Sequence, residues 1–334
     1  MFPKLFKIPF INQPVYTYGL MLVIAFLAAI YLIRRLSKDI TPKPQMITNA
    51  ALYALVAGIA GARLFYVFHY WDDFRDNFFS ILAIWDGGLE QLGGALTAIL
   101  VIFLYIRFHK LPARKFFDII AIALVLALAI GRIGCFASGC CFGKPSKLPW
   151  AVRFPYASNS FNSQILPNHN RNRPQPYLNL PSDFYDASRL KPYSELTDRQ
   201  KKSVAPGFLF CFSGSATQSL NLFVHPTQLY SSSAAGLLSL TLFLLWRRNK
   251  KIPAAKKGRK FLSADGTVFA LMFIFYSVGR FLMEFLRDDN PYEYGWWAVY
   301  KGGTISQNIS IYIFIAGLVL LFIFQRIAAK KSNT

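Results

Sequence analysis

The sequence of 334 residues is poor in histidine and cysteine, with four of each. No four of these residues stand at the spacing of a zinc site, so we expect no bound metal and no cofactor. Acidic residues are also scarce, since 16 Asp and Glu stand against 37 Lys and Arg for a net charge of +21. No soluble basic domain accompanies this excess, which argues against a nucleic-acid-binding protein. The absence of a fixed-period repeat excludes a solenoid.

Charged residues are rare in seven long stretches of the chain, whose overall hydrophobic content is 54%. A helix needs about 20 apolar residues to cross the core of a bilayer. The stretches lie near 15–36, 48–70, 87–107, 116–136, 226–246, 266–286 and 306–326. We therefore predict an all-α polytopic membrane protein with seven transmembrane helices.

A long polar segment, 144–224, interrupts these stretches and is rich in Asn, Pro and Ser. We predict that it forms a small external head. The chain then divides into 1–143 with the first four helices, 144–224 as the head insert, and 225–334 with the last three helices.

The basic residues of the short loops indicate the orientation, because cytoplasmic loops carry an excess of Lys and Arg. Four basic groups fall on one side of the predicted topology, with Asp-rich loops on the other. This places the N-terminus outside and the C-terminus in the cytoplasm, next to anionic membrane lipid. The basic groups are Arg34, Arg35, Lys38 and Lys43; Arg107, Lys110, Arg114 and Lys115; 247–260; and Arg326, Lys330 and Lys331.

Three arginines, Arg63, Arg132 and Arg280, each follow a glycine closely near the end of an apolar stretch. A guanidinium at the centre of a membrane helix costs about 2.5–3.5 kcal/mol, so it normally faces a protein interior or a wet cavity. These arginines are candidates for binding an anion within the membrane.

Arg280, Glu284 and Arg287 stand at spacings of four and three, so they share one helix face. One interpretation is a structural ion-pair network between helices. The other is an anion site, because two guanidinium groups against one carboxylate leave donors for a phosphate.

Two glycine-rich segments, 85–94 and 131–143, do not read as plain lipid-facing helices. Non-helical backbone at membrane depth requires burial by protein or contact with water, which favours a cavity wall. Close helix packing through small residues is the alternative.

These motifs resemble those of the prolipoprotein diacylglyceryl transferase family, nearly from end to end. The resemblance is carried by residues 18–21, 61–63, 85–88 with 93–94, 131–134, 225–230 and 279–280 with Glu284 and Arg287. It implies an enzyme of the bacterial plasma membrane that transfers the diacylglyceryl group of phosphatidylglycerol to the lipobox cysteine of a prolipoprotein signal peptide, releasing glycerol phosphate.

The reaction creates negative charge on the departing phosphate, so fixed cations in a dry pocket stabilise its transition state. We predict catalytic roles for Arg132, Arg280 and Glu284. Arg63 and Arg287 are expected to orient substrate or support the structure. The predicted substrate-binding set is Tyr18, Arg63, Gly87, Gly88, Gly93, Gly94, Gly131, Gly134, His225, Gln228 and Arg287.

The chain also departs from the family pattern in its polar groups. Cys135, Ser138 and Cys140 stand where the family has two asparagines and a glutamate, Leu92 where many members have histidine, and Ser231 where a glutamate often follows. The general base therefore stays open between Glu90, His69, His225, Glu284 and no dedicated base. These changes also leave two other functions possible: an inactive homologue that binds lipid or signal segments, and a lipid transferase with another acceptor. A transporter is a third class, although no paired broken segments mark two repeats.

The four cysteines, Cys135, Cys140, Cys141 and Cys211, fall on the predicted external side, where disulfides persist. A disulfide, packing of small residues and a catalytic thiol are the three roles that the sequence leaves open.

Overall fold

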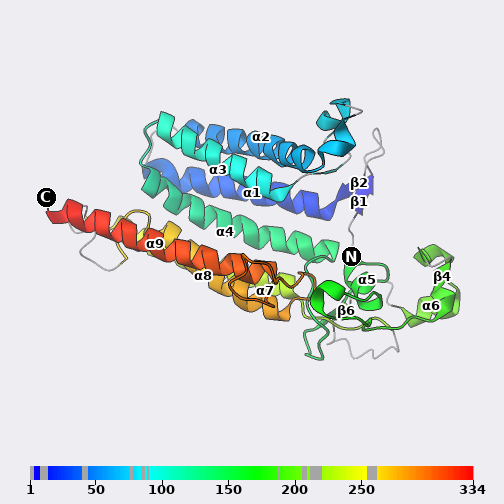
Figure 1. The fold of residues 1–334 in the computed structure, drawn as a ribbon. Coiled ribbons are helices and arrows are strands. Elements are labelled where there is room, and N and C mark those ends of the chain that lie inside the picture. Colours follow the sequence, from blue (N-terminus) through cyan, green and yellow to red (C-terminus); the bar gives the residue numbers. More distant parts are fainter. Residues whose placement is uncertain are drawn as a thin grey trace.

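Within the residues that the computed structural model describes, seven long helices run side by side (Figure 1). The described residues are 4–7, 14–39, 44–75, 78–83, 87–88, 90–186, 189–204, 209–210, 220–253 and 262–333. The long helices are α1 (Thr17–Leu36), α2 (Pro44–His69), α3 (Gln91–Phe108), α4 (Ala113–Ser138), α7 (Thr227–Lys250), α8 (Thr267–Met283) and α9 (Ile305–Asn333).

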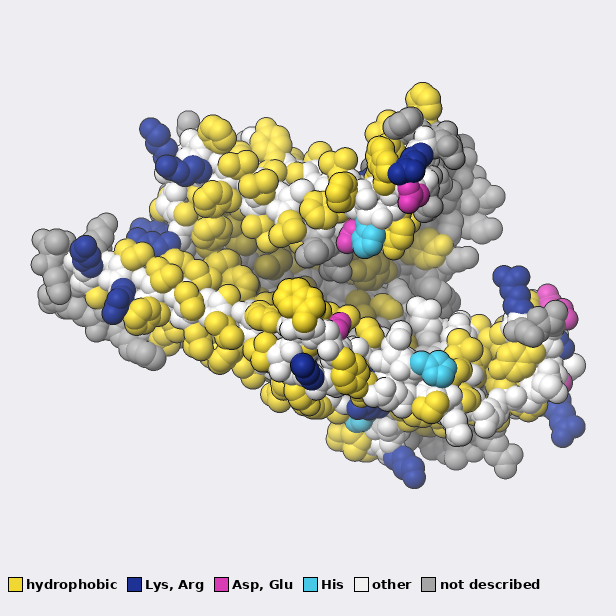
Figure 2. Space-filling view, viewed as in Figure 1, with side chains coloured by type: hydrophobic (Ala, Val, Ile, Leu, Met, Phe, Trp, Pro, Cys, Tyr) yellow, Lys and Arg dark blue, Asp and Glu magenta, His cyan; other side chains and the backbone are white. Residues whose placement is uncertain are grey.

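Each predicted apolar stretch coincides with one of these helices. In the described part of the chain, six of them are long and apolar enough to cross a membrane, whereas the apolar segment of α3, Gly93–Phe108, is shorter. Figure 2 shows apolar side chains covering the long sides of the helices, with Lys and Arg gathered towards the ends. The fold is thus an all-α polytopic membrane protein, as predicted.

Helix α4 is the centre of the helical bundle, because it packs against α1, α7 and α8. Helices α2 and α3 form a hairpin beside α1, and α9 packs on α8 (Figure 1). The buried side chains of Ile122 on α4, Leu242 on α7 and Val268 on α8 belong to one apolar core. This core fixes the three helices whose far ends carry the site described below.

Asp118, a buried carboxylate on α4, holds the beginning of α8 in place. Helix α8 starts after Gly266 without a capping side chain of its own. Asp118 instead accepts hydrogen bonds from the backbone N–H groups of Gly266 at 2.8 Å and Phe269 at 2.9 Å. A carboxylate at a helix N-terminus satisfies free N–H groups and complements the helix dipole.

The segment between α4 and α7 forms a small unit at one end of the bundle (Figure 1). Tyr156, Phe161 and Phe184 are buried in its own apolar core. Strand β3 pairs antiparallel with β6, and β4 pairs antiparallel with β5. Its elements are β3 (Val152–Arg153), α5 (Asn159–Ile165), β4 (Tyr185–Asp186), β5 (Arg189–Leu190), α6 (Asp198–Ser203) and β6 (Leu209–Phe210).

The two chain ends lie at opposite ends of the bundle. The hairpin of β1 (Lys4–Lys7) and β2 (Pro14–Tyr16) lies near the end that carries the α4–α7 segment, and α9 extends the C-terminus away from it (Figure 1). The basic loop between α3 and α4 is at the same end as the C-terminus, because α4 starts there and runs towards the α4–α7 segment.

Candidate functional site

A cavity of about 320 Å³ lies between α4, α7 and α8. Most of its wall is apolar, with Leu128 from α4, Leu238 from α7 and Phe275 from α8. Arg132 and Arg280 also line it, each within two turns of the end of its helix. The structure therefore brings together two of the three arginines singled out in the sequence, in an apolar cavity at the end that faces the α4–α7 segment.

Arg132 has free hydrogen-bonding capacity in this cavity. Among the described residues, it has no hydrogen-bond or ion-pair partner, and its side chain is only partly buried. An added Cβ at Gly131 or at Gly279 would meet nothing within 4 Å, so both glycines that precede the cavity arginines border open space. The guanidinium of Arg132 has five N–H donors that a bound anion can use.

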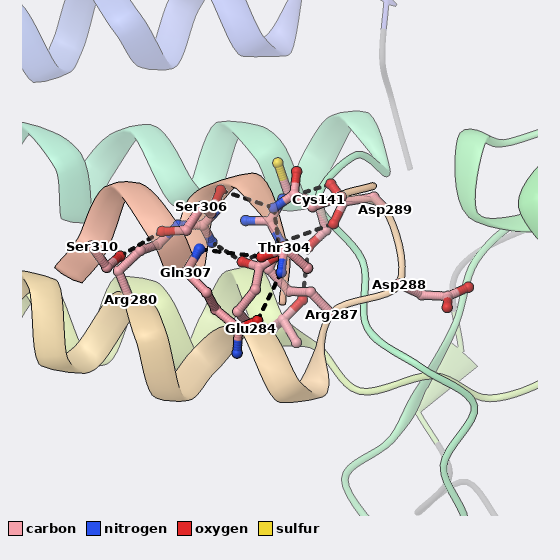
Figure 3. A network of polar contacts seen from close by, with 12 residues as sticks. Cys141, Arg280, Glu284, Arg287, Asp288, Asp289, Thr304, Ser306, Gln307 and Ser310 are labelled. Carbon is pink, nitrogen blue, oxygen red and sulfur yellow. Dashed lines mark hydrogen bonds and ion pairs between the residues drawn. The ribbon is translucent and has the colours of Figure 1, made fainter. Parts of the chain in front are cut away.

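Arg280 is partly neutralised by its neighbour Glu284 (Figure 3). Its Nη1 lies 3.0 Å from Glu284 Oε2, and its Nη2 donates to Ser306 Oγ at 2.8 Å. The Glu284 side chain is fully buried, and its other oxygen accepts a hydrogen bond from Asn290 Nδ2 at 2.5 Å. Glu284 therefore fixes the direction in which Arg280 presents its remaining donors.

Arg287 has a carboxylate partner that the helical spacing did not reveal. Its Nε and Nη2 donate to the two oxygens of Asp289 at 2.8 and 2.5 Å, while Glu284 Oε2 lies 3.9 Å from Nε. Asp289 thus offsets the positive excess predicted for the ladder of Arg280, Glu284 and Arg287. The net positive charge at the cavity comes instead from Arg132.

The chain that follows α4 is pinned between the beginning of α7 and the end of α8. Gly143 N donates to the carbonyl of His225 at 3.1 Å, and Lys144 N donates to the carbonyl of Leu286 at 2.8 Å. An added Cβ at Gly143 would lie 2.5 Å from His225 Cβ and 2.8 Å from the Leu286 oxygen, so only glycine fits there. We call residues 140–144, 224–228 and 286–288 the helix junction.

Gln228 and His225, both predicted to bind substrate, lie in the helix junction. Gln228 is fully buried and donates from Nε2 to the carbonyl of Cys140 at 2.6 Å. Burial, with Lys144 nearby, lowers the pKa of His225 below its ordinary value. A neutral imidazole with an acceptor nitrogen follows at physiological pH.

Arg63, the third arginine, is fully engaged within its own part of the chain. It donates from Nε to the carbonyl of Ile81 at 2.8 Å and from Nη2 to that of Ser80 at 2.5 Å. Its Nη1 donates to the carbonyls of Gly87 at 2.7 Å and Gly88 at 3.0 Å. Both glycines have positive φ, which turns their carbonyls towards the arginine. Of the two roles expected for Arg63, these contacts account for structural support, and substrate binding by Arg63 stays a prediction.

Gly93 and Gly94 lie where α3 packs against α2. An added Cβ would lie 2.3 Å from Phe65 Cγ at Gly93, and 2.9 Å from the carbonyl oxygen of Gly58 at Gly94. Close packing, one of the two interpretations of these glycines, accounts for both.

Tyr18 on α1 lies against the end of α4. An added Cβ at Gly134 would lie 3.3 Å from Tyr18 Cδ2 and 2.9 Å from Met21 Cβ, so Gly134 lets the two helices approach. Tyr18 also lies within electrostatic range of Arg132. The ring therefore belongs to the surroundings of the site.

The candidate bases are spread over two places. Nδ1 of His69, at the end of α2, lies 3.7 Å from Glu90 Oε2, and the His69 ring stacks on Tyr70. Glu284 is paired with Arg280, and His225 lies in the helix junction. The side chain of Leu92 lies outside the described residues.

Three thiols form a cluster that their positions in the sequence do not indicate. The Sγ atoms of Cys135, Cys140 and Cys141 lie within 4.8 Å of one another, and all three cysteines are free. Their spacing in the sequence is not that of a zinc motif. Left-handed backbone at Gly139 (φ 72°) and at Cys141 (φ 59°) brings the three residues together. The alternative of a disulfide is not realised among these three, and Cys211 lies outside the described residues.

Comparisons with known proteins cover almost the whole chain. A family model described as prolipoprotein diacylglyceryl transferase matches residues 3–323. Relatives with the name phosphatidylglycerol–prolipoprotein diacylglyceryl transferase include one from Clostridium tetani, 29% identical over 322 residues (95% of this chain and 96% of the relative). Another, from Prochlorococcus marinus, is 27% identical over 321 residues (91% and 86%). A third, from Streptococcus uberis, is 26% identical over 317 residues (93% and 92%).

Proposed function

This chain belongs to the prolipoprotein diacylglyceryl transferase family, and we propose that its cavity is the site at which phosphatidylglycerol donates a diacylglyceryl group to the lipobox cysteine of a prolipoprotein. The protein is a transferase of lipoprotein maturation and a multi-pass protein of the bacterial plasma membrane.

The topology that we propose has seven spans, with α3 as the third. The basic loops at the C-terminal end of the bundle support a cytoplasmic C-terminus by the positive-inside rule. The N-terminal hairpin and the α4–α7 segment are then external, and the segment forms an external head. Arg132 and Arg280 consequently lie in the outer half of the membrane, at the depth of lipid phosphates.

The cavity suits the upper part of one phospholipid. Its arginine end provides charge for the phosphate, and the wall that includes Leu128 and Leu238 offers apolar contact to the beginnings of the acyl chains. The volume is at the lower end of the range for ligand pockets, about 300–1,000 Å³, so the rest of the chains extends into the bilayer. Arg132 is the observation that supports this proposal most strongly, because a guanidinium in an apolar wall with no partner among the described residues favours an anionic ligand.

In the reaction, the acceptor thiolate attacks the glyceryl carbon next to the phosphate and forms a thioether. The carbon–oxygen bond breaks, and glycerol phosphate leaves with one more negative charge than the diester had. Arg132 and Arg280 stabilise this charge as it develops, more strongly than they stabilise bound substrate. Glu284 holds Arg280 in position through their ion pair. Asp289 holds Arg287, whose guanidinium also lies near Glu284.

The acceptor thiol must lose a proton before it attacks. Among the described residues that line the cavity, none is Asp, Glu or His. The pair of His69 and Glu90 belongs to α2 and the start of α3, which pack mainly against each other and not against the cavity helices. Glu284 lies next to Arg280, but its oxygens are engaged by Arg280 and Asn290. The described residues around the cavity arginines therefore include no free general base.

The direct test is mass spectrometry of a synthetic lipobox peptide incubated with the purified protein and phosphatidylglycerol. The expected result is a peptide heavier by one diacylglyceryl group, with release of glycerol phosphate. Arg132→Ala should abolish most of this product, whereas Arg107→Ala, at the other end of the bundle, should not. No product with any anionic phospholipid would refute the assignment.

A further inference from the structure

The cluster of Cys135, Cys140 and Cys141 is arranged as a set of metal ligands. Each residue offers one Sγ, and the three atoms lie within 4.8 Å of one another. In a tetrahedral zinc site with bonds of about 2.3 Å, two sulfurs stand about 3.8 Å apart. The cluster therefore needs only small side-chain adjustments to surround one ion.

The loop that carries the thiols is held rigid from outside the cluster. Thr227 Oγ1 donates to the carbonyl of Cys141 at 2.7 Å, and Gln228 Nε2 donates to that of Cys140 at 2.6 Å. Cys141 is held at a positive φ of 59°, which a residue with a side chain adopts only when its surroundings impose it. Support of this kind, in which outer residues fix the direction of the ligands, is typical of metal sites.

The charge around the cluster matches a zinc ion bound by three thiolates. Such a group carries a net charge of −1, and an anion buried next to a membrane requires nearby cations. Arg287 and Arg132 both lie within electrostatic range of Cys141. Figure 3 shows Cys141 beside the part of the polar network that carries Arg287 and Asp289. The cluster is thus near Arg132, one of the two arginines of the proposed lipid site.

We propose that Cys135, Cys140 and Cys141 bind one zinc ion whose fourth position is open, and that the lipobox cysteine occupies this position as a zinc-bound thiolate. The second half of this inference rests on the proposed function. Three protein ligands with an open position are the pattern of catalytic zinc, whereas structural sites are closed by four. Zinc is preferred over a redox metal because no step of the transfer changes an oxidation state.

This role supplies what the cavity lacks, a means of ionising the acceptor. Zinc takes the thiol as thiolate, and the proton passes to water. The sulfur then attacks the glyceryl carbon, glycerol phosphate leaves, and the neutral thioether product dissociates because it is a weaker ligand. Atoms and charge balance without any oxidant or reductant.

The metal content of the full-length protein tests whether the three cysteines bind zinc. The protein is purified in detergent with a non-thiol reductant, loaded with zinc, desalted and measured by inductively coupled plasma mass spectrometry. We expect one zinc per chain, lost in Cys135→Ser, Cys140→Ser and Cys141→Ser. Cys211→Ser is the matched control and should keep its zinc. Absence of zinc from the reduced wild type, or a disulfide among the three cysteines in purified protein, would overturn the site.

Cobalt spectroscopy of the wild-type protein tests the open position without any variant that risks misfolding. Co²⁺ in the site should give the visible bands of a tetrahedral thiolate complex. A lipobox peptide should shift these bands, and the same peptide with serine in place of its cysteine should not. Equal spectra with both peptides, or loss of metal in Cys211→Ser, would show that the fourth position is not open to the acceptor.

Peptide lipidation measured on the same samples separates the two proposals. Lipidation that continues after a chelator has removed all zinc would overturn the catalytic role of the metal and leave the transferase function intact. A zinc site that accepts the peptide thiol in a protein that transfers no lipid would contradict the proposed function and support the metal site.

Discussion

Replacing Arg132 by glutamine should remove activity without removing stability. Arg132 has no partner among the described residues, so its loss breaks no contact that holds the fold. In the reaction it faces one additional negative charge on the leaving phosphate. At about 4 Å and an effective dielectric constant of about 20, that interaction is worth about 4 kcal/mol. Since about 1.4 kcal/mol corresponds to a factor of ten, the rate should fall about 10²–10³-fold.

The assay is initial-rate peptide lipidation in vesicles of phosphatidylglycerol, with thermal unfolding in detergent measured on the same preparations. Arg107→Gln is the control, because Arg107 is an exposed arginine at the opposite end of the bundle. We expect the midpoint of unfolding to stay within the error of the wild type in both variants. An Arg132→Gln protein with a rate within threefold of wild type, or with strongly reduced stability, would refute the assignment of Arg132 as a phosphate ligand.

Three further substitutions probe the structural contacts. Arg63→Lys should destabilise the protein by about 3 kcal/mol, because a lysine cannot make the hydrogen bonds that the guanidinium of Arg63 donates to four carbonyls. Chemical unfolding in detergent measures this loss. Asp118→Ala should cost about 1–2 kcal/mol in the same experiment by uncapping α8, whereas Asp118→Asn, which keeps one acceptor, should cost less. The pKa of His225 is lower in the folded protein than in the unfolded chain. As the pH falls below about 6.5, the imidazole of His225 is therefore protonated in the unfolded chain before it is protonated in the folded protein. Stability should therefore decline from that pH downward, and His225→Gln should flatten the decline in thermal unfolding curves recorded from pH 7.5 to 5.

The long helices could be predicted from the sequence because length and apolar composition decide them locally. The limits of α1 and α8 follow from where the apolar runs begin and end. The beginning of α3 is harder to predict, since Gly93 and Gly94 in its first turn also allow an irregular entry. Membrane insertion leaves few alternatives for such stretches.

The roles of the arginines could not be separated in the same way. Arg63 and Arg132 both follow a glycine at a membrane-helix end and look alike in the sequence. The difference arises from the carbonyls of Ser80, Ile81 and Gly87, which accept hydrogen bonds from Arg63. No described residue makes such a contact with Arg132. The contact between Asp289 and Arg287 was equally invisible, because both residues follow the end of α8, where the helical spacing of Arg280, Glu284 and Arg287 no longer applies.

The cysteine cluster escaped sequence reasoning for a related reason. Its geometry depends on left-handed backbone at Gly139 and at Cys141. It also depends on the side chains of Thr227 and Gln228 on α7, which donate to the carbonyls of Cys141 and Cys140. A residue other than glycine at a positive φ leaves no mark in a sequence. The spacing rules for zinc sites therefore do not identify these three residues, whose metal-binding role is our proposal.

The helix junction also governs how this protein can vary between relatives. The two ends of the segment from 145 to 223 lie side by side at the helix junction, because Pro145 and Val152 both form backbone bridges with Val224. Lengthening a loop whose ends are already fixed costs little, about 0.6 kcal/mol for each doubling. The segment is therefore an exchangeable module, in which residues can be gained, lost or grafted while the spacing of the cavity arginines stays constant.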